Sequence, residues 1–138
     1  MKKHVVTLLI LTLVALPGLL SAQTRTVIKA QVPFDFVAKG KTMPAGECTI
    51  EARGDGQTVL SINSGNQHLF AIPNASESRN PSENTSLVFH KYGDRYFLAA
   101  INRQGENRGY KLPAGKLEKE LRAQNVAAND VTLLASAK

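Results

Sequence analysis

The feature that most constrains the fold is a succession of short segments in which apolar and polar residues alternate. Cys48, Ile50 and Ala52, for example, alternate with more polar neighbours, which is typical of a strand with one buried face. Turn residues follow such segments, as at Asp55-Gly56, which suits the positive φ values of a tight hairpin. Because the segments recur about every ten residues, we expect a mainly β fold. About seven or eight antiparallel strands would form either a small barrel or a sandwich.

Two polar segments and the C-terminal region depart from this alternation. Residues 73–86 contain a single apolar residue besides proline, so we expect a long exposed loop, and residues 102–109 form a second polar loop. Residues 114–124 are predicted to form one short helix, because leucines and an acid–base pair recur four residues apart. Residues 126–138 are expected to form a flexible tail, with a last strand over 131–135 as the alternative.

The N-terminal segment has the character of a secretory signal peptide. Lys2 and Lys3 precede an unbroken apolar run, which ends at a helix-breaking proline and a small residue suited to cleavage. The run is too short to span a bilayer core of ~30 Å comfortably. We therefore expect residues 1–22 to be removed and residues 23–138 to form a single β domain without a transmembrane helix. Its expected location is the periplasm or the extracellular space.

Cys48 is the only cysteine of the chain, which excludes an internal disulfide framework and a cysteine-cluster metal site. In an oxidising compartment a lone thiol is usually buried, because an exposed one would pair between chains. Cys48 shares a predicted strand face with Ile50 and Ala52. We expect it to be a small buried hydrophobic residue rather than a nucleophile or an intermolecular bridge.

Three motifs occur together in the mature part: Val32-Pro33-Phe34-Asp35-Phe36, Met43-Pro44-Ala45-Gly46 and Tyr92-Gly93-Asp94-Arg95-Tyr96-Phe97-Leu98. In this combination the chain resembles a group of small exported β-rich proteins, frequent in acidobacterial genomes, that carry no assigned activity. Cys48 stands where that group usually has tyrosine. The resemblance implies a bacterial source and an envelope or extracellular location, and it carries over no catalytic residues.

The mature part contains two histidines, His68 and His90, both in the middle of predicted strands. Paired across a sheet, they could hold a metal together with Asp35 or Asp94. However, they lack the close spacing typical of metal-binding histidine pairs. We therefore expect two solvent-facing or hydrogen-bonded strand histidines, and both are only weak candidates for a functional site.

The sequence carries no signature of a catalytic mechanism. No Gly-x-Ser-x-Gly elbow surrounds Ser61 or Ser64, and no glycine-rich phosphate or dinucleotide motif is present. Glu47 and Glu51 share a strand face but would lie about 13 Å apart, farther than a glycosidase pair. We expect neither enzymatic activity nor a cofactor, and an active site assembled only in space remains as an alternative.

The formal net charge is +6, of which Lys2 and Lys3 in the leader contribute two. The remaining basic residues are scattered, and export makes nucleic acid an implausible partner. A modest positive charge favours an anionic partner, such as an envelope polymer, or another envelope protein.

The leading hypothesis is a non-catalytic exported envelope or extracellular β module with a binding or structural role. Its contacts would come from the two polar loops, because loops on a rigid sheet vary without harming the core. The candidate interaction residues are Asn74, Arg79, Asn84, Arg103 and Arg108.

Besides an enzyme whose active site is assembled only in space, two alternative functions remain. The first is a small β-barrel that carries an apolar ligand. Against it, the phenylalanines would fill a small barrel and leave no cavity; they are Phe34, Phe36, Phe70, Phe89 and Phe97. The second is assembly through an exposed edge, if the predicted strand over 24–32 lies unpaired. A further expectation is that Tyr92 and Tyr96 form a cross-strand pair around the intervening turn.

Overall fold

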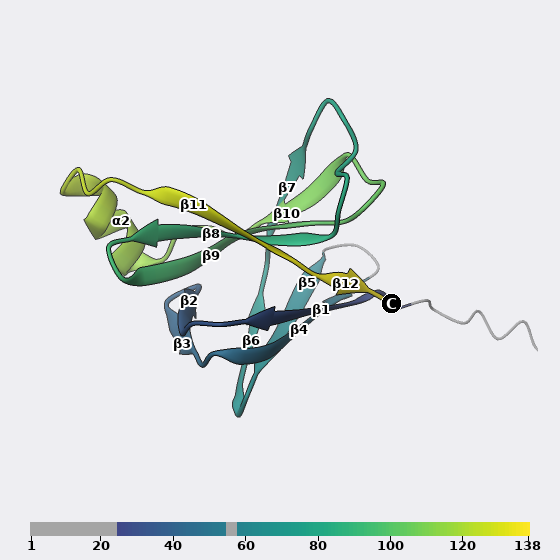
Figure 1. Ribbon diagram of the computed structural model, residues 1–138, viewed down its shortest axis with the longest axis horizontal. Coiled ribbons are helices and arrows are strands. Elements are labelled where there is room, and N and C mark those ends of the chain that lie inside the picture. The colour runs from purple at the N-terminus through teal and green to yellow at the C-terminus, as the bar shows by residue number, and fades with distance from the viewer. Residues whose placement is uncertain (1–24, 55–57) are drawn as a thin grey trace, which may run out of the picture.

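In the computed structural model, which describes residues 25–54 and 58–138, two β-sheets pack on each other (Figure 1). The sandwich alternative is therefore confirmed, since the sheets do not close into a barrel. The described residues form twelve strands, several of them only two to four residues long, and one short helix. The predicted leader over 1–22 and the Asp55-Gly56 turn lie outside the described residues.

The first sheet is five-stranded and antiparallel, in the order β12-β1-β4-β5-β6. Its strands are β1 (Val27–Val32), β4 (Gly46–Arg53), β5 (Val59–Ser64), β6 (Gln67–Ala71) and β12 (Ser136–Ala137). The register places Ile28 opposite Ile50, Ile50 opposite Ile62 and Ile62 opposite Leu69. All four side chains are buried, so one apolar row crosses four strands and defines the core face of this sheet.

The second sheet has the order β11-β8-β9-β10-β7, with a small hairpin attached to β9. Its strands are β7 (Asn74–Glu77), β8 (Ser86–Tyr92), β9 (Arg95–Asn102), β10 (Arg108–Lys111) and β11 (Asn129–Leu134), and the hairpin consists of β2 (Phe36–Ala38) and β3 (Lys41–Met43). Strand β2 pairs with β9 in parallel, at Val37 and Phe97, while Lys41 donates a hydrogen bond to the carbonyl of His68 on β6. The hairpin therefore connects the two sheets at one end of the sandwich.

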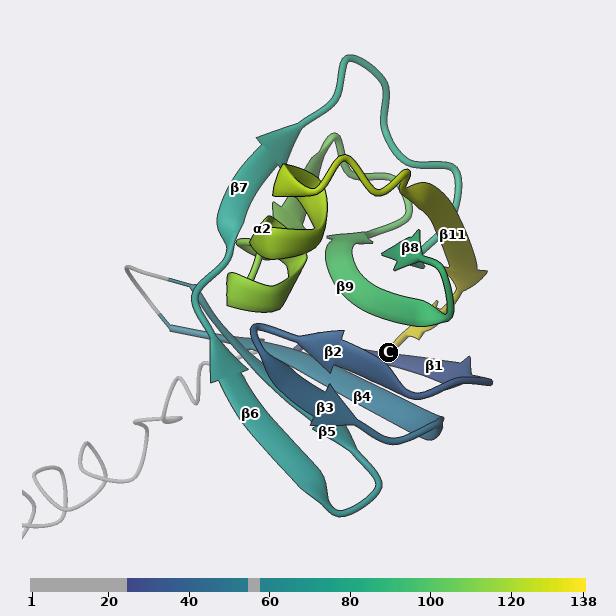
Figure 2. The ribbon, with the colours of Figure 1, turned by 90° about the vertical axis from the view of Figure 1, so that its left-hand side faces the viewer.

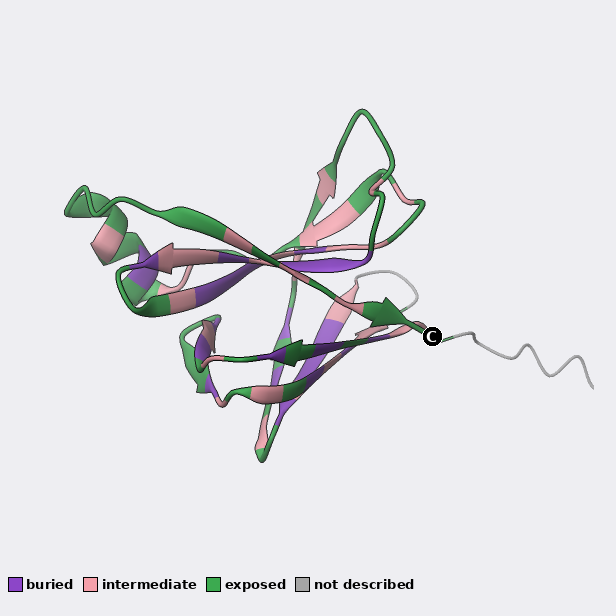
Figure 3. Ribbon diagram, viewed as in Figure 1, coloured by how far each residue is buried: buried purple, intermediate pink, exposed green. Residues whose placement is uncertain are grey.

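The core lies between the sheets, where Phe36 and Phe89 are almost fully buried with ring centroids 5.4 Å apart. Figure 3 shows buried residues on strands of both layers and exposed residues over much of β7, β10 and the helix. One expected core residue is wrong: Phe70 is 56% exposed. Leu69 and Ala71 occupy the inner face of β6, and strand alternation therefore turns His68 and Phe70 outward.

The prediction that Tyr92 and Tyr96 form a cross-strand pair is also wrong. The Gly93-Asp94 turn places Tyr92 opposite Arg95 and Lys91 opposite Tyr96. Tyr96 instead stacks on Phe34, with ring centroids 3.7 Å apart.

Two segments expected to be irregular contain strands. The segment 73–86 contains β7, which pairs with β10 along its whole length, from Asn74 opposite Lys111 to Glu77 opposite Arg108. An edge strand needs backbone partners rather than apolar side chains, and this is why hydrophobic alternation did not reveal it.

Of the two alternatives for the C-terminal region, the structure fits the last strand over 131–135 rather than the flexible tail over 126–138, because β11 pairs with β8 and β12 pairs with β1. The chain end therefore forms part of both sheets. Strand β1 (Val27–Val32) is flanked by β4 and β12, so the described part of the predicted 24–32 strand is not the unpaired edge that assembly through it would require.

Helix α2 (Lys116–Ala123) confirms the helix predicted within 114–124. It lies near the β8–β9 turn (Figure 1), and Figure 2 shows it beside the layer formed by β8, β9 and β11. Within residues 25–54 and 58–138, no helix is long and apolar enough to cross a membrane.

Candidate functional site

The two segments predicted as interaction loops are joined into one surface, which we call the joined surface and define as residues 74–86 and 102–111. Beyond the β7–β10 ladder, the Ser78 amide donates to the Asn107 carbonyl at 2.8 Å, and the Ser82 amide donates to the Glu106 carbonyl at 2.9 Å. The Gly105 amide returns a hydrogen bond to the Ser82 carbonyl at 2.9 Å. In Figure 1, β7 and β10 lead away from the first sheet toward these loops. Backbone hydrogen bonds therefore join the two segments at several points.

All five candidate interaction residues lie on the joined surface. Asn74, Arg79, Asn84 and Arg108 are exposed, and Arg103 is partly buried. Arg108 and Glu77 form an ion pair across the ladder, with Nε 3.1 Å from Oε1. Because both side chains are mostly exposed, this pair contributes little to stability.

A polar pocket of about 220 Å³ is lined by residues of the paired strands β7 and β10 and of the segments beside them. We call it the β7–β10 pocket. Besides the Glu77–Arg108 pair, the side chains that line it are hydroxyls, amides and one amine, from Ser76, Ser78, Ser82, Asn102, Asn107 and Lys111. Such groups donate and accept hydrogen bonds without a fixed charge, apart from Lys111. The pocket therefore suits a ligand that carries several hydroxyl or carbonyl groups.

Gly109 shapes one wall of the β7–β10 pocket. A Cβ atom at this position would lie 2.9 Å from Asn102 Oδ1, 2.9 Å from the Ile101 carbonyl oxygen and 3.1 Å from Ser76 Oγ. The missing side chain therefore lets the Asn102 amide and the Ser76 hydroxyl approach the backbone of β10. Asn102 and Ser76 were not among the candidates, and only the β7–β10 pairing would have revealed them.

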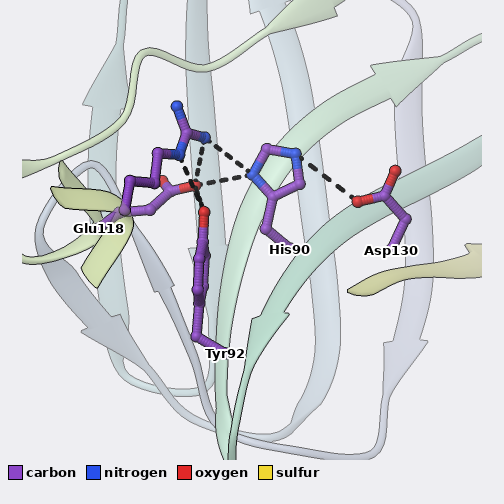
Figure 4. A network of polar contacts seen from close by, with 5 residues as sticks. His90, Tyr92, Glu118 and Asp130 are labelled. Carbon is purple, nitrogen blue, oxygen red and sulfur yellow. Dashed lines mark hydrogen bonds and ion pairs between the residues drawn. The ribbon is translucent and has the colours of Figure 1, made fainter. Parts of the chain in front are cut away.

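His90 belongs to a polar network that links β8 to α2 (Figure 4). Its Nδ1 lies 2.7 Å from Oε1 of Glu118, and its Nε2 lies 3.8 Å from Oδ1 of Asp130 on β11. Arg122 Nη2 lies 3.2 Å from the same Nδ1, so this ring nitrogen contacts both the carboxylate and the guanidinium. His90 is therefore a hydrogen-bonded strand histidine that contacts both flanking elements.

Glu118 is the centre of this network, with a side chain that is 5% exposed. Its Oε1 accepts a hydrogen bond from Arg122 Nη2 at 2.7 Å, and Arg122 Nε donates to the Tyr92 hydroxyl at 2.9 Å. The hydrogen bond to Tyr92 and the negative charge of Glu118 raise the pKa of Arg122. The guanidinium therefore stays protonated. The network attaches α2 to the second sheet by a satisfied buried carboxylate.

His68 lies on the outer face of the first sheet. Its Nε2 lies 3.2 Å from Ser61 Oγ, and its ring packs edge-on against Phe70 with centroids 4.4 Å apart. Ser61 is only 3% exposed, which denies a substrate access to this serine–histidine pair. The structure does not bring His68 and His90 together, since they lie on strands of different sheets. Within the described ranges, no group of three or more metal-ligating side chains could hold a metal ion.

Cys48 is completely buried, as expected. Burial raises the pKa of its thiol from 9.0 to about 12, so the thiol stays protonated and unreactive at neutral pH.

Comparisons with protein-family models, curated proteins and solved structures gave no match to this chain.

Proposed function

We propose that this protein is a non-catalytic exported β-sandwich module that binds a polar polymer of the cell envelope through the joined surface. The observation that carries the proposal is the hydrogen bonding of two distant polar segments around the β7–β10 pocket. A polar surface that is held rigid loses little conformational freedom when a ligand binds. The export part of the proposal rests on the leader-like residues 1–22 and on the resemblance to small exported proteins.

The lining of the β7–β10 pocket supports a polyhydroxylated ligand. Serine hydroxyls and the amides of Asn102 and Asn107 match the mixed donor and acceptor pattern of a sugar hydroxyl group. Lys111 adds a positive charge, which favours a polymer with a negative charge.

The non-catalytic part is supported by the state of the reactive side chains. The Cys48 thiol and the Ser61 hydroxyl are buried, and Oε1 of the buried Glu118 is hydrogen-bonded to Arg122 and lies 2.7 Å from His90 Nδ1. In these positions the three side chains contribute packing and hydrogen bonds to the fold, and no catalytic role is needed to explain them.

Co-sedimentation with envelope polymer tests the proposal. The protein is expressed with its own leader, recovered in its processed form and mixed with insoluble polysaccharide prepared from the host envelope. We expect wild-type protein to sediment with the polymer, less strongly as salt is raised. Asn102→Ala and Lys111→Gln should each weaken binding about tenfold, because each loses a hydrogen bond or charge at the ligand.

Lys119→Gln is the matched control, since Lys119 is an exposed lysine on α2 and does not line the β7–β10 pocket. It should sediment as the wild type does. The proposal is wrong if wild-type protein stays in the supernatant, or if Lys119→Gln weakens sedimentation as much as Lys111→Gln.

A further inference from the structure

Strand β11 (Asn129–Leu134) forms an open edge of the second sheet (Figure 2). It pairs with β8 on one side, and no strand of the described residues pairs with its other side. The amide of Ala135, directly after β11, donates a hydrogen bond to the Thr85 carbonyl at 2.9 Å, on the side of β8. Backbone groups alternate in direction along an antiparallel strand. The N–H and C=O groups of Asp130, Thr132 and Leu134 therefore point to the open side, where a further strand could bind them.

The other sheet edges are shorter or are protected. Strands β12, β3 and β7 have two, three and four residues, whereas β11 has six. At the β6 edge, Lys41 donates a hydrogen bond to the His68 carbonyl, and Pro73 lies shortly after the strand. Proteins prevent edge pairing by shortening an edge strand or by placing lysine or proline on it, and β11 contains neither residue. Among the described strands, β11 is therefore the edge best suited to pair with another chain.

The side chains of β11 are complementary to a second copy of the same strand. Val131 and Leu133 are only partly buried against the core, and Leu134 on the other face is 70% exposed. In an antiparallel pair centred on Thr132, Val131 of each copy lies opposite Leu133 of the other copy. The two Thr132 side chains lie opposite each other, which is also a favourable cross-strand pair. A second copy would therefore complete the burial of the apolar residues that line this side of the core.

The same register suits the backbone groups and the charges. Asp130 of each copy lies opposite Leu134 of the other, so each residue with open backbone groups faces another such residue. A register centred on Asp130 would instead place two carboxylates directly opposite each other, which is unfavourable. We propose that two copies of this protein form a symmetric dimer by antiparallel pairing of β11 around Thr132. This inference goes beyond the proposed function and does not depend on the identity of the polymer.

Sedimentation equilibrium tests the dimer directly. The protein is expressed with its own leader, recovered in its processed form and measured over a wide range of concentrations. We expect the average mass to rise with concentration from that of the monomer toward twice that value. A monomer at every concentration overturns the proposal.

Two substitutions of Leu134 test the register, because this exposed side chain faces Asp130 of the second copy. Leu134→Asp places like charges opposite each other, whereas Leu134→Lys places opposite charges there. We expect the lysine variant to dimerise at least about fivefold more tightly than the aspartate variant, since the unlike pair occurs twice in a symmetric dimer. Equal dimerisation of the two variants overturns the pairing through β11. Leu134 is largely exposed, so neither substitution disturbs the core.

Thr132→Pro removes the amide hydrogen that points to the open side, and proline is tolerated at such a position of an edge strand. We expect this variant to stay monomeric at concentrations where the wild type is half dimeric. Thr132→Val is the matched control, because valine keeps the amide hydrogen and favours strands. It should dimerise as the wild type does. A proline variant that is folded by circular dichroism and still dimerises overturns the proposal.

Hydrogen exchange of wild-type protein, followed by nuclear magnetic resonance, gives a measurement that does not depend on how a variant folds. We expect the amides of Asp130, Thr132 and Leu134 to exchange slowly at dimeric concentrations and rapidly after dilution. Concentration-dependent protection of β6 or β7 in place of β11 would put the interface at another edge and overturn the proposal.

Discussion

Arg108 on β10 lies directly opposite Glu77 on β7, and the two side chains form an ion pair although 31 residues separate them in the chain. The backbone ladder around them, rather than this exposed pair, holds the two polar segments together.

Gly109→Ala should destabilise the protein by about 1–3 kcal/mol, because its Cβ would overlap the Ile101 carbonyl oxygen, which cannot turn away. Arg108→Ala, one residue away, should cost less than about 1 kcal/mol. Urea unfolding of both variants measures the difference. Equal effects would mean that the close approach at Gly109 does not constrain the ladder.

Glu118→Gln should destabilise the protein by about 1–3 kcal/mol, because Arg122 and His90 lose a shared charged acceptor. The cost stays below that of a fully buried pair, since Arg122 is half exposed. Glu120→Gln is the control: its side chain is exposed and its nearest pairing, with Lys116, is at 4.0 Å. Chemical denaturation at neutral pH compares them. Similar losses in both variants would contradict the role given to the buried carboxylate.

The raised pKa of Cys48 predicts a loss of stability in alkali. The unfolded thiol ionises near 9.0 and the folded one near 12, so above pH 9 the unfolded state binds fewer protons. The contribution of Cys48 is thus fully present below pH 9 and is lost as the pH rises toward 12, at up to about 1.4 kcal/mol per pH unit. Cys48→Ala should show a shallower decline over this range. Parallel curves for the two proteins would refute the buried, protonated thiol.

Phenylalanines on opposite faces should respond very differently to substitution. Phe89→Ala, in the core, should cost about 3–5 kcal/mol, whereas Phe70→Ser, on the outer face of β6, should change stability by less than about 0.5 kcal/mol. Thermal or urea unfolding distinguishes them. A large loss for Phe70→Ser would indicate that its face is covered in solution.

Hydrophobic alternation was sufficient to predict the β class and the buried Cys48, and the four-residue spacing of leucines and of an acid–base pair predicted the short helix. Alternation failed where strands are held by backbone pairing alone, as in β7, whose side chains are polar or small and exposed or half-buried. The core assignment of Phe70 failed for another reason: it followed the aromatic character of the residue, whereas strand alternation places Phe70 on the same outer face as His68.

The site was predictable in outline only. Loop polarity was enough to select Arg103 and Arg108, but the β7–β10 ladder, which no local pattern encodes, determines that Ser76 and Asn102 share a pocket with Arg108. The spacing of Glu118 and Arg122 indicated their ion pair, but the hydrogen bond between His90 and Glu118 was missed for the same reason. It joins a strand to a helix 28 residues away, and nothing in the sequence beside His90 indicates Glu118.

Hydrogen exchange of the processed protein, with and without its envelope polysaccharide, tests the central claim most directly. We predict slower exchange in residues 74–86 and 102–111 on binding, with β4 and β6 unchanged. Protection confined to the outer face of β6, or protection of no segment despite binding, would contradict the assignment of the joined surface as the binding site.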